Sequence, residues 1–408
     1  MARHITVALL SGSSVTLQLE ETATVSELRS QAEEELRERK WLEPAACLRW
    51  LVTTNGTKLP PAEQLAAAFQ DLNLGAEVTL TGITARSRRV KSGRAYAELA
   101  GDGSVRTWGK ASAEGPELPA GLRDVKELHG SDDGAFAALQ EDGSVVTWGH
   151  PDKGGDSEVV HAQLHDVTTI EATSFAFAAL RSDGLVVTWG HPNRGGIVNG
   201  FHELADVTGI KGNFRAFAAI RADGSVTTWG QAGFGGESQG VSEQLKDVFQ
   251  IEATSGAFAA LTRDEDVVTW GMALAGGDTA AFRDQLQGVS KICAGSLAFA
   301  VLRKDGSVVT WGHAEFGGDS REVQDRLKDV RDLVSSGGAF AALLADGSVV
   351  AWGFAESGSD ISEVAELLQG VRHLAAEPPS SFVATLSTGE VVRWGAEAVP
   401  VALQLLWI

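Results

Sequence analysis

Three histidines share one recurring position, directly after a Trp-Gly pair, and they are the residues best suited to chemistry in this chain. They are His150, His191 and His313. Imidazoles commonly bind zinc, but a zinc site needs ligands that converge on one point. Only the first two come from consecutive copies of the Trp-Gly pattern, and other copies carry Gln231, Met272 and Phe354 at this position. The pattern therefore predicts loop residues that face a partner.

Two Gly-Gly-Asp-Ser segments, at 154–157 and 317–320, are the second candidate for chemistry. Neither has the alternating carboxylates of a calcium loop or the lysine of a phosphate loop. We interpret them as turns, with Asp156 and Asp319 as further candidates for contact with a partner. No nucleophile, base and orienting group can be assembled from the sequence. We therefore predict a protein that is not an enzyme and has no cofactor, no catalytic site and no metal site.

These residues belong to a repeat. Trp-Gly recurs at a spacing of 40 to 42 residues, which is typical of propellers and solenoids. The tryptophans are Trp108, Trp148, Trp189, Trp229, Trp270, Trp311, Trp352 and Trp394. Because each copy has one, they are expected to pack the structure rather than to react.

Each copy is expected to contain three short strands. Ala135–Leu139 and Ser144–Trp148 are separated by Asp142-Gly143, a strong signal for a hairpin turn. A third run precedes each hairpin, as in Val167–Ile170. The repeated acids Asp142, Asp183, Asp223, Asp305 and Asp346 are explained by the turn itself.

The two ends of the repeat array suggest how it closes. The first copy is predicted to lack its leading strand, because the matching positions hold Arg86, Arg89 and Lys91, and residues 85–94 are interpreted as a basic linker. A nuclear-import or membrane-surface signal is the alternative for this cluster. The chain ends in a strand-like run, 403–408, which we expect to pair beside Ala95–Leu99 and to close a ring at 95–408, since closure removes exposed sheet edges.

Residues 1–84 differ from the repeats and are predicted to form an α+β domain of their own. Alternating residues at 5–9 and 15–19 indicate a hairpin, Thr24 or Ser26 begins a helix, and runs at 48–52 and 77–81 indicate two more strands.

Composition limits the partners and the compartment. The net charge of −20 argues against binding to nucleic acid, which requires an excess of Lys and Arg, and favours a protein partner with a basic surface. Two cysteines, Cys47 and Cys293, lie far apart, and no run is long and apolar enough to span a membrane. We expect an intracellular protein, cytoplasmic or nuclear, with no membrane span.

Residues 95–408 resemble regulator of chromosome condensation repeats, in which an Asp-Gly turn is followed by a strand that ends in Trp-Gly. The resemblance implies a β-propeller, usually of seven blades in that family. The eight hairpins here favour about eight short three-stranded blades, with seven as the alternative. It also implies a protein-protein interaction scaffold or adaptor, with guanine-nucleotide exchange on a small GTPase as the alternative.

Residues 1–84 resemble a ubiquitin-like (β-grasp) domain, through the hairpin, Thr24–Leu28, Asn55–Leu59 and Glu77–Thr81. This resemblance implies a link to the ubiquitin pathway. It implies a built-in domain and not a conjugated modifier, because the chain continues through Gly82 instead of ending in Gly-Gly.

Overall fold

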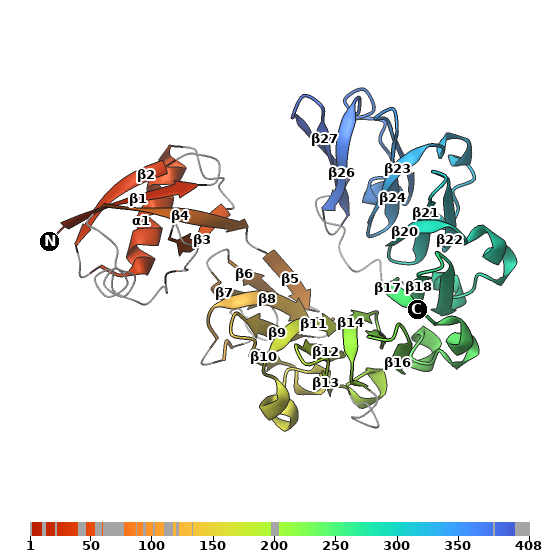
Figure 1. Cartoon of the computed structure of the whole chain (residues 1–408), viewed down its shortest axis with the longest axis horizontal. Helices are drawn as coiled ribbons and strands as arrows, with labels where there is room; N and C mark the ends of the chain where they lie inside the picture. The colour runs from red at the N-terminus through yellow and green to blue at the C-terminus, as the bar shows by residue number, and fades with distance from the viewer. Residues whose placement is uncertain are drawn as a thin grey trace. The chain divides into compact units, whose positions relative to one another are not determined.

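The computed structural model describes residues 2–9, 14–20, 23–39, 46–53, 59, 77–86, 88–92, 95–100, 103–109, 117–119, 122–132, 134–196, 204–377 and 380–395. The chain divides into two compact units, Met1–His150 and Pro151–Ile408, which are described one at a time. Both are built mainly of β-strands (Figure 1). Among the described residues, no helix is long and apolar enough to cross a membrane.

The first unit begins with a mixed four-stranded sheet in the order β2-β1-β4-β3. Its strands are β1 (Ala2–Leu9), β2 (Ser14–Glu20), β3 (Ala46–Val52) and β4 (Glu77–Arg86), with β1 and β4 parallel. Helix α1 (Val25–Glu38) starts at a capping box in which Thr24 and Glu27 each accept the other's backbone N–H. Leu28, Ala32 and Leu36 of α1 are fully buried in one core with strand residues. These strands and this helix lie where the sequence predicts them.

A three-stranded sheet follows, and it corrects two predictions. Residues 88–92 are not part of a linker but form strand β5 (Arg88–Ser92), antiparallel to β6 (Ala95–Leu99), which also pairs with β7 (Val105–Gly109). The first repeat therefore has its leading strand. The cations suggest a linker, but they lie on the exposed face of a strand. Arg89 and Lys91 are exposed, whereas Ser92 is fully buried and accepts the Gly134 N–H at 2.7 Å.

The same sheet corrects the predicted pairing of the C-terminus. Strand β6 is central, with β5 on one side and β7 on the other, so no edge of β6 remains for residues 403–408. That segment itself lies outside the described residues.

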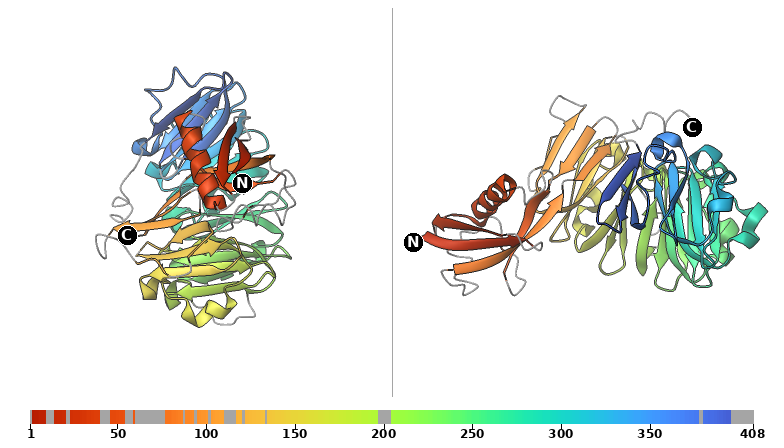
Figure 2. Two further views of the ribbon diagram at one scale, coloured as in Figure 1. Left: turned by 90° about the vertical axis from the view of Figure 1, so that its left-hand side faces the viewer. Right: turned by 90° about the horizontal axis from the view of Figure 1, so that it is seen from above.

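Seven further sheets repeat this three-stranded pattern, so the described chain holds eight, as the sequence predicts. The first unit adds β8 (Val125–Gly130), β9 (Ala135–Gln140) and β10 (Val145–Gly149). The second unit has β11 (Val167–Ala172), β12 (Ala176–Arg181), β13 (Val186–Gly190), β14 (Val207–Gly212), β15 (Ala216–Arg221), β16 (Val226–Gly230), β17 (Val248–Ala253), β18 (Ala257–Thr262), β19 (Val267–Gly271), β20 (Val289–Ala294), β21 (Ala298–Arg303), β22 (Val308–Gly312), β23 (Val330–Ser336), β24 (Ala339–Leu344), β25 (Val349–Gly353), β26 (Val371–Glu377), β27 (Ser381–Leu386) and β28 (Val391–Gly395). Within the second unit, consecutive sheets contact each other (Figure 2).

Within the second unit, aromatic residues join consecutive sheets. Phe258 of β18 and Trp270 of β19 stack with ring centroids 5.3 Å apart and lie in one core with Ala216 and Ala218 of the preceding sheet. The small alanines leave room for the large rings. Trp270 Nε1 also donates to the Gly235 carbonyl, in the connection between the two sheets, at 3.0 Å. Trp189, Trp229, Trp311, Trp352 and Trp394 donate in the same way to a glycine carbonyl of the preceding connection. These six tryptophans are therefore buried and hydrogen-bonded to the connection that precedes their own sheet.

The hairpin turns use their aspartates as predicted. Asp305 Oδ1 accepts the Ser307 N–H at 2.9 Å, and the Ser307 hydroxyl donates to the same oxygen at 2.5 Å. These hydrogen bonds, the side-chain one first, lower the pKa of Asp305. The next residue of the turn is glycine with positive φ, for example Gly306 at +79°. One repeat departs from this rule, because Glu265 holds the glycine position at φ +68°.

Replacing Glu265 with glycine is expected to stabilise the protein by about 1 kcal/mol, because a residue with a Cβ is strained in the left-handed region. The variant also loses the contact between Glu265 and Lys304, but this ion pair is exposed and contributes little. Urea unfolding would measure the gain. The matched control is Gly306→Glu, the reverse change in the next repeat, which should destabilise; equal midpoints for the two variants would contradict the assignment of strain.

Candidate binding surface

One end of the sheets in the second unit carries residues that differ from repeat to repeat. In five of the repeats described there, the residue after Trp-Gly donates its backbone N–H to the carbonyl of the residue just before the second strand, at 2.8 to 2.9 Å. We call these pairs the variable row: His191 with Phe175, Gln231 with Arg215, Met272 with Gly256, His313 with Leu297, and Phe354 with Gly338. The hydrogen bond is constant, whereas the side chains range from none to aromatic and cationic.

A ladder of backbone hydrogen bonds fixes the spacing of the row. Ser174 N–H donates to Phe214 O at 2.9 Å, and Phe214 N–H donates to Ser255 O at 3.2 Å. The series continues from Ser255 to Ser296 and from Ser296 to Gly337, at 2.7 and 2.6 Å. Each step joins the loop beside one second strand to the matching loop of the next repeat. The row is therefore held by main-chain contacts that do not depend on its side chains.

Buried side chains anchor the connections that border the row. Asn213 Nδ2 donates to Phe234 O at 2.7 Å, and Thr254 Oγ1 donates to Ala275 O at 2.9 Å. Thr173 makes the equivalent contact with Arg194 O at 3.3 Å. These bonds place the short 3₁₀ helices that follow Trp-Gly, namely η3 (Pro192–Arg194), η5 (Ala232–Phe234) and η7 (Ala273–Ala275), against the row.

Cations and aromatic rings meet at the first part of the row. Arg194 Cζ lies 3.8 Å and Lys153 Nζ 4.0 Å from the ring centroid of Phe175. Arg215 Cζ lies 4.8 Å from the ring centroid of Phe234. We call these five residues the cation–aromatic cluster. Burial, followed by the charge of Arg194, lowers the pKa of Arg215, so the two guanidinium groups repel each other.

A run of aromatic residues occupies another part of the row. The Phe316 and Phe354 rings stack with centroids 5.8 Å apart, and His313 meets Phe316 edge-on at 5.3 Å. The three rings come from two consecutive repeats and are all half-exposed. Such amphipathic rings are enriched where proteins bind one another.

Two of the predicted partner-facing residues are brought together. Asp156 and His191 line the same cavity, of about 660 Å³, together with Trp189. Val159, on the same cavity, has 97% of its surface exposed. Asp156 also stabilises its own turn, because Oδ1 accepts the Glu158 N–H at 2.9 Å.

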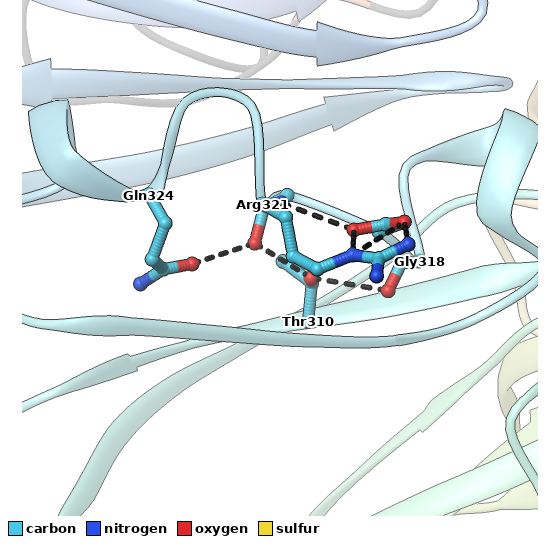
Figure 3. A network of polar contacts seen from close by, with 6 residues as sticks. Thr310, Gly318, Arg321 and Gln324 are labelled. Carbon is cyan, nitrogen blue, oxygen red and sulfur yellow. Dashed lines mark hydrogen bonds and ion pairs between the residues drawn. The ribbon is translucent and has the colours of Figure 1, made fainter.

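Asp319, a third predicted residue, is occupied by contacts with Arg321 of its own loop, which Figure 3 labels. Its carboxylate accepts the Arg321 N–H at 3.0 Å and pairs with the Arg321 guanidinium, and these contacts lower the pKa of Asp319 to about 2. Nearby, Thr310 Oγ1 donates to Gly318 O at 3.2 Å, and Ser320 Oγ donates to Gln324 Oε1 at 2.8 Å. The loop is thus a hydrogen-bonded turn, as the glycines suggest.

The three histidines are not brought together. His191 and His313 belong to the variable row three repeats apart, and His150 is an exposed residue of the first unit whose N–H donates to Gly134 O. In the part of the chain that the structure describes, no three His, Cys, Asp or Glu residues are grouped as metal ligands. The sequence analysis does not identify Phe175, Arg194 and Arg215 as candidate binding residues. The signal that could have found them is the variation of residue type at these positions among otherwise similar repeats.

No protein-family model matches the chain, and no curated protein does. Solved structures that resemble it include the ectodomain of the Physcomitrella patens receptor kinase CR4, with 20% identity over 65% of this chain and 73% of that one and a TM-score of 0.38. Prp20p from Saccharomyces cerevisiae, described with its binding to Gsp1p and histones, has 17% identity over 60% and 76%, with a TM-score of 0.39. The CRINKLY WD40 ectodomain of Arabidopsis thaliana ACR4 has 16% identity over 75% and 94%, with a TM-score of 0.37.

Proposed function

We propose that this protein is a non-enzymatic interaction scaffold that binds a partner protein along the variable row. The proposal includes a closed propeller of regulator of chromosome condensation type, preceded by a ubiquitin-like domain that links the scaffold to the ubiquitin pathway. We further propose an intracellular location, cytoplasmic or nuclear.

The observation that carries the proposal is that buried, repeated residues hold each repeat together, whereas half-exposed residues at one end vary. The repeated Phe and Trp side chains are buried and join neighbouring sheets, so they serve the fold. In five repeats of the second unit, the variable row has the same backbone hydrogen bond but a different pair of side chains. A regular backbone that presents changing, half-exposed side chains is the arrangement that repeat proteins use for recognition.

The experiment compares partners captured by the natural chain and by a row variant with His313→Ala and Phe354→Ala. Each captured protein is then purified and its affinity measured directly. We expect the row variant to bind its partner at least about tenfold more weakly, since aromatic contacts dominate many interfaces. The control is Leu185→Ala at the hairpin-turn end. An equal loss in both variants, or none in either, would contradict binding at the row.

Guanine-nucleotide exchange is the second candidate function, and it rests on the repeat resemblance alone. A panel of purified small GTPases loaded with labelled nucleotide tests it directly. A scaffold leaves the rate of nucleotide release unchanged, whereas acceleration that the row variant abolishes would replace the scaffold proposal with exchange.

A further inference from the structure

The cation–aromatic cluster has a charge opposite to that of the chain around it. The chain carries 54 acidic and 34 Lys and Arg residues, yet Lys153, Arg194 and Arg215 gather at adjacent connections. The loops of Phe175 and Arg215 are joined directly, because Ser174 N–H donates to Phe214 O. The cluster is therefore one continuous surface rather than separate cations.

The two arginines are not neutralised by any carboxylate that the structure describes. Among the described residues, neither Arg194 nor Arg215 forms an ion pair with a carboxylate, and the Arg215 side chain instead donates to Gln231 Oε1 at 3.3 Å. Two other surface cations of the second unit show the contrast, because Arg321 pairs with Asp319 and Lys246 pairs with Glu243. Two half-buried guanidinium groups that repel each other would be stabilised by a bound anion.

The aromatic rings hold the arginines in place for such an anion. A guanidinium stacked on a ring keeps its N–H groups in the plane of the ion, free to donate to a carboxylate in pairs. Two hydrogen bonds restrain the backbone of both arginines. Thr173 Oγ1 donates to the Arg194 carbonyl, and the Arg215 N–H donates to Asn213 Oδ1 at 2.9 Å. Little conformational entropy is lost when a ligand binds to side chains that are already ordered.

We infer that the cation–aromatic cluster binds an acidic segment of a partner protein, with Arg194 and Arg215 pairing with its Asp or Glu carboxylates. The inference rests on the proposed function and names the chemistry of one partner segment. The net charge of −20 does not prevent it, because beyond about 8 Å salt screens the other charges at physiological ionic strength. A basic partner surface, expected from the overall charge, would contact other parts of the chain.

The test measures binding of a fluorescent oligo-glutamate peptide to the full chain by anisotropy. We expect binding that weakens as salt is added, and a loss of about tenfold or more in the double variant Arg194→Gln/Arg215→Gln. The control, Lys246→Gln/Arg321→Gln, removes the same two charges from paired sites and should keep its affinity within about twofold, since surface pairs contribute little. Unfolding midpoints of both variants verify that each is folded.

Three results would overturn the inference: no salt-sensitive binding of oligo-glutamate, an equal loss in both double variants, or tighter cluster-dependent binding of a single-stranded oligonucleotide than of the peptide. The last would assign the cluster to nucleic acid. His313 and Phe354 are unchanged in these variants, so partner capture through the aromatic part of the row can succeed or fail separately. Failure of this inference is therefore distinguishable from failure of the proposed function.

Discussion

Replacing Gly235 with alanine is expected to lower the free energy of unfolding by about 3 to 5 kcal/mol, from left-handed strain combined with overpacking. Gly235 has φ +88°, and a Cβ built on it would lie 2.8 Å from Cδ2 of the Phe258 ring. Phe258 cannot retreat, because it is fully buried between two sheets. The substitution would also displace the carbonyl that accepts the Trp270 Nε1–H. Urea unfolding followed by tryptophan fluorescence measures the loss.

Gly233→Ala is the matched control, two residues earlier in the same connection. A Cβ on Gly233 meets nothing within 4 Å, and its φ is not in the left-handed region. We expect a change within about 0.5 kcal/mol, as for ordinary surface positions. If the two alanine variants unfold at the same urea concentration, the close contact between connection and ring does not stabilise the fold.

The strands could be predicted because their signals are local. Alternating residues, the Asp-Gly turn and the regular Trp spacing each lie within a few residues of the element that they define. The leading strand of the first repeat is harder to predict, because Arg89 and Lys91 resemble the charges of a linker. Only their alternation with Val90 and Ser92 fits a strand with one exposed face.

Much of the candidate surface could not be predicted, because it depends on contacts between residues that are distant in sequence. Arg194 and Phe175 lie nearly half a repeat apart in sequence, and nothing local indicates that the cation covers the ring. The hydrogen bond from Trp270 to Gly235 likewise spans 35 residues. His191 could be identified as a loop residue from its position after Trp-Gly, but its pairing with Phe175 follows from the register of β12 and β13.

Truncating Phe258 to alanine is expected to cost about 3 to 5 kcal/mol, the range for a large aromatic residue removed from a closed core. Its ring fills the space left by Ala216 and Ala218 of the preceding sheet and stacks on Trp270. Both neighbours are fixed in hydrogen-bonded strands, so the cavity cannot collapse easily. Loss of this magnitude is a large share of the 5 to 15 kcal/mol that stabilises a typical domain. The urea midpoint of the variant measures the effect.

Phe249→Ala, in the same three-stranded sheet, is the matched control, because it removes the same side chain from an exposed position. Phe249 on β17 keeps 49% of its surface exposed, whereas Phe258 on β18 is fully buried. The same atoms are removed in both variants, but at Phe249 no closed cavity is left, so we expect a loss of about 1 kcal/mol or less. A larger loss at Phe249 than at Phe258 would mean that the sheets are not held together by the buried phenylalanines. A larger loss at Phe258 than at Phe249 is the expected order. The contact of Phe258 with the preceding sheet then accounts for the repeated Ala-Phe-Ala pattern, since each repeat supplies a ring and also the small residues against which the ring of the next repeat packs.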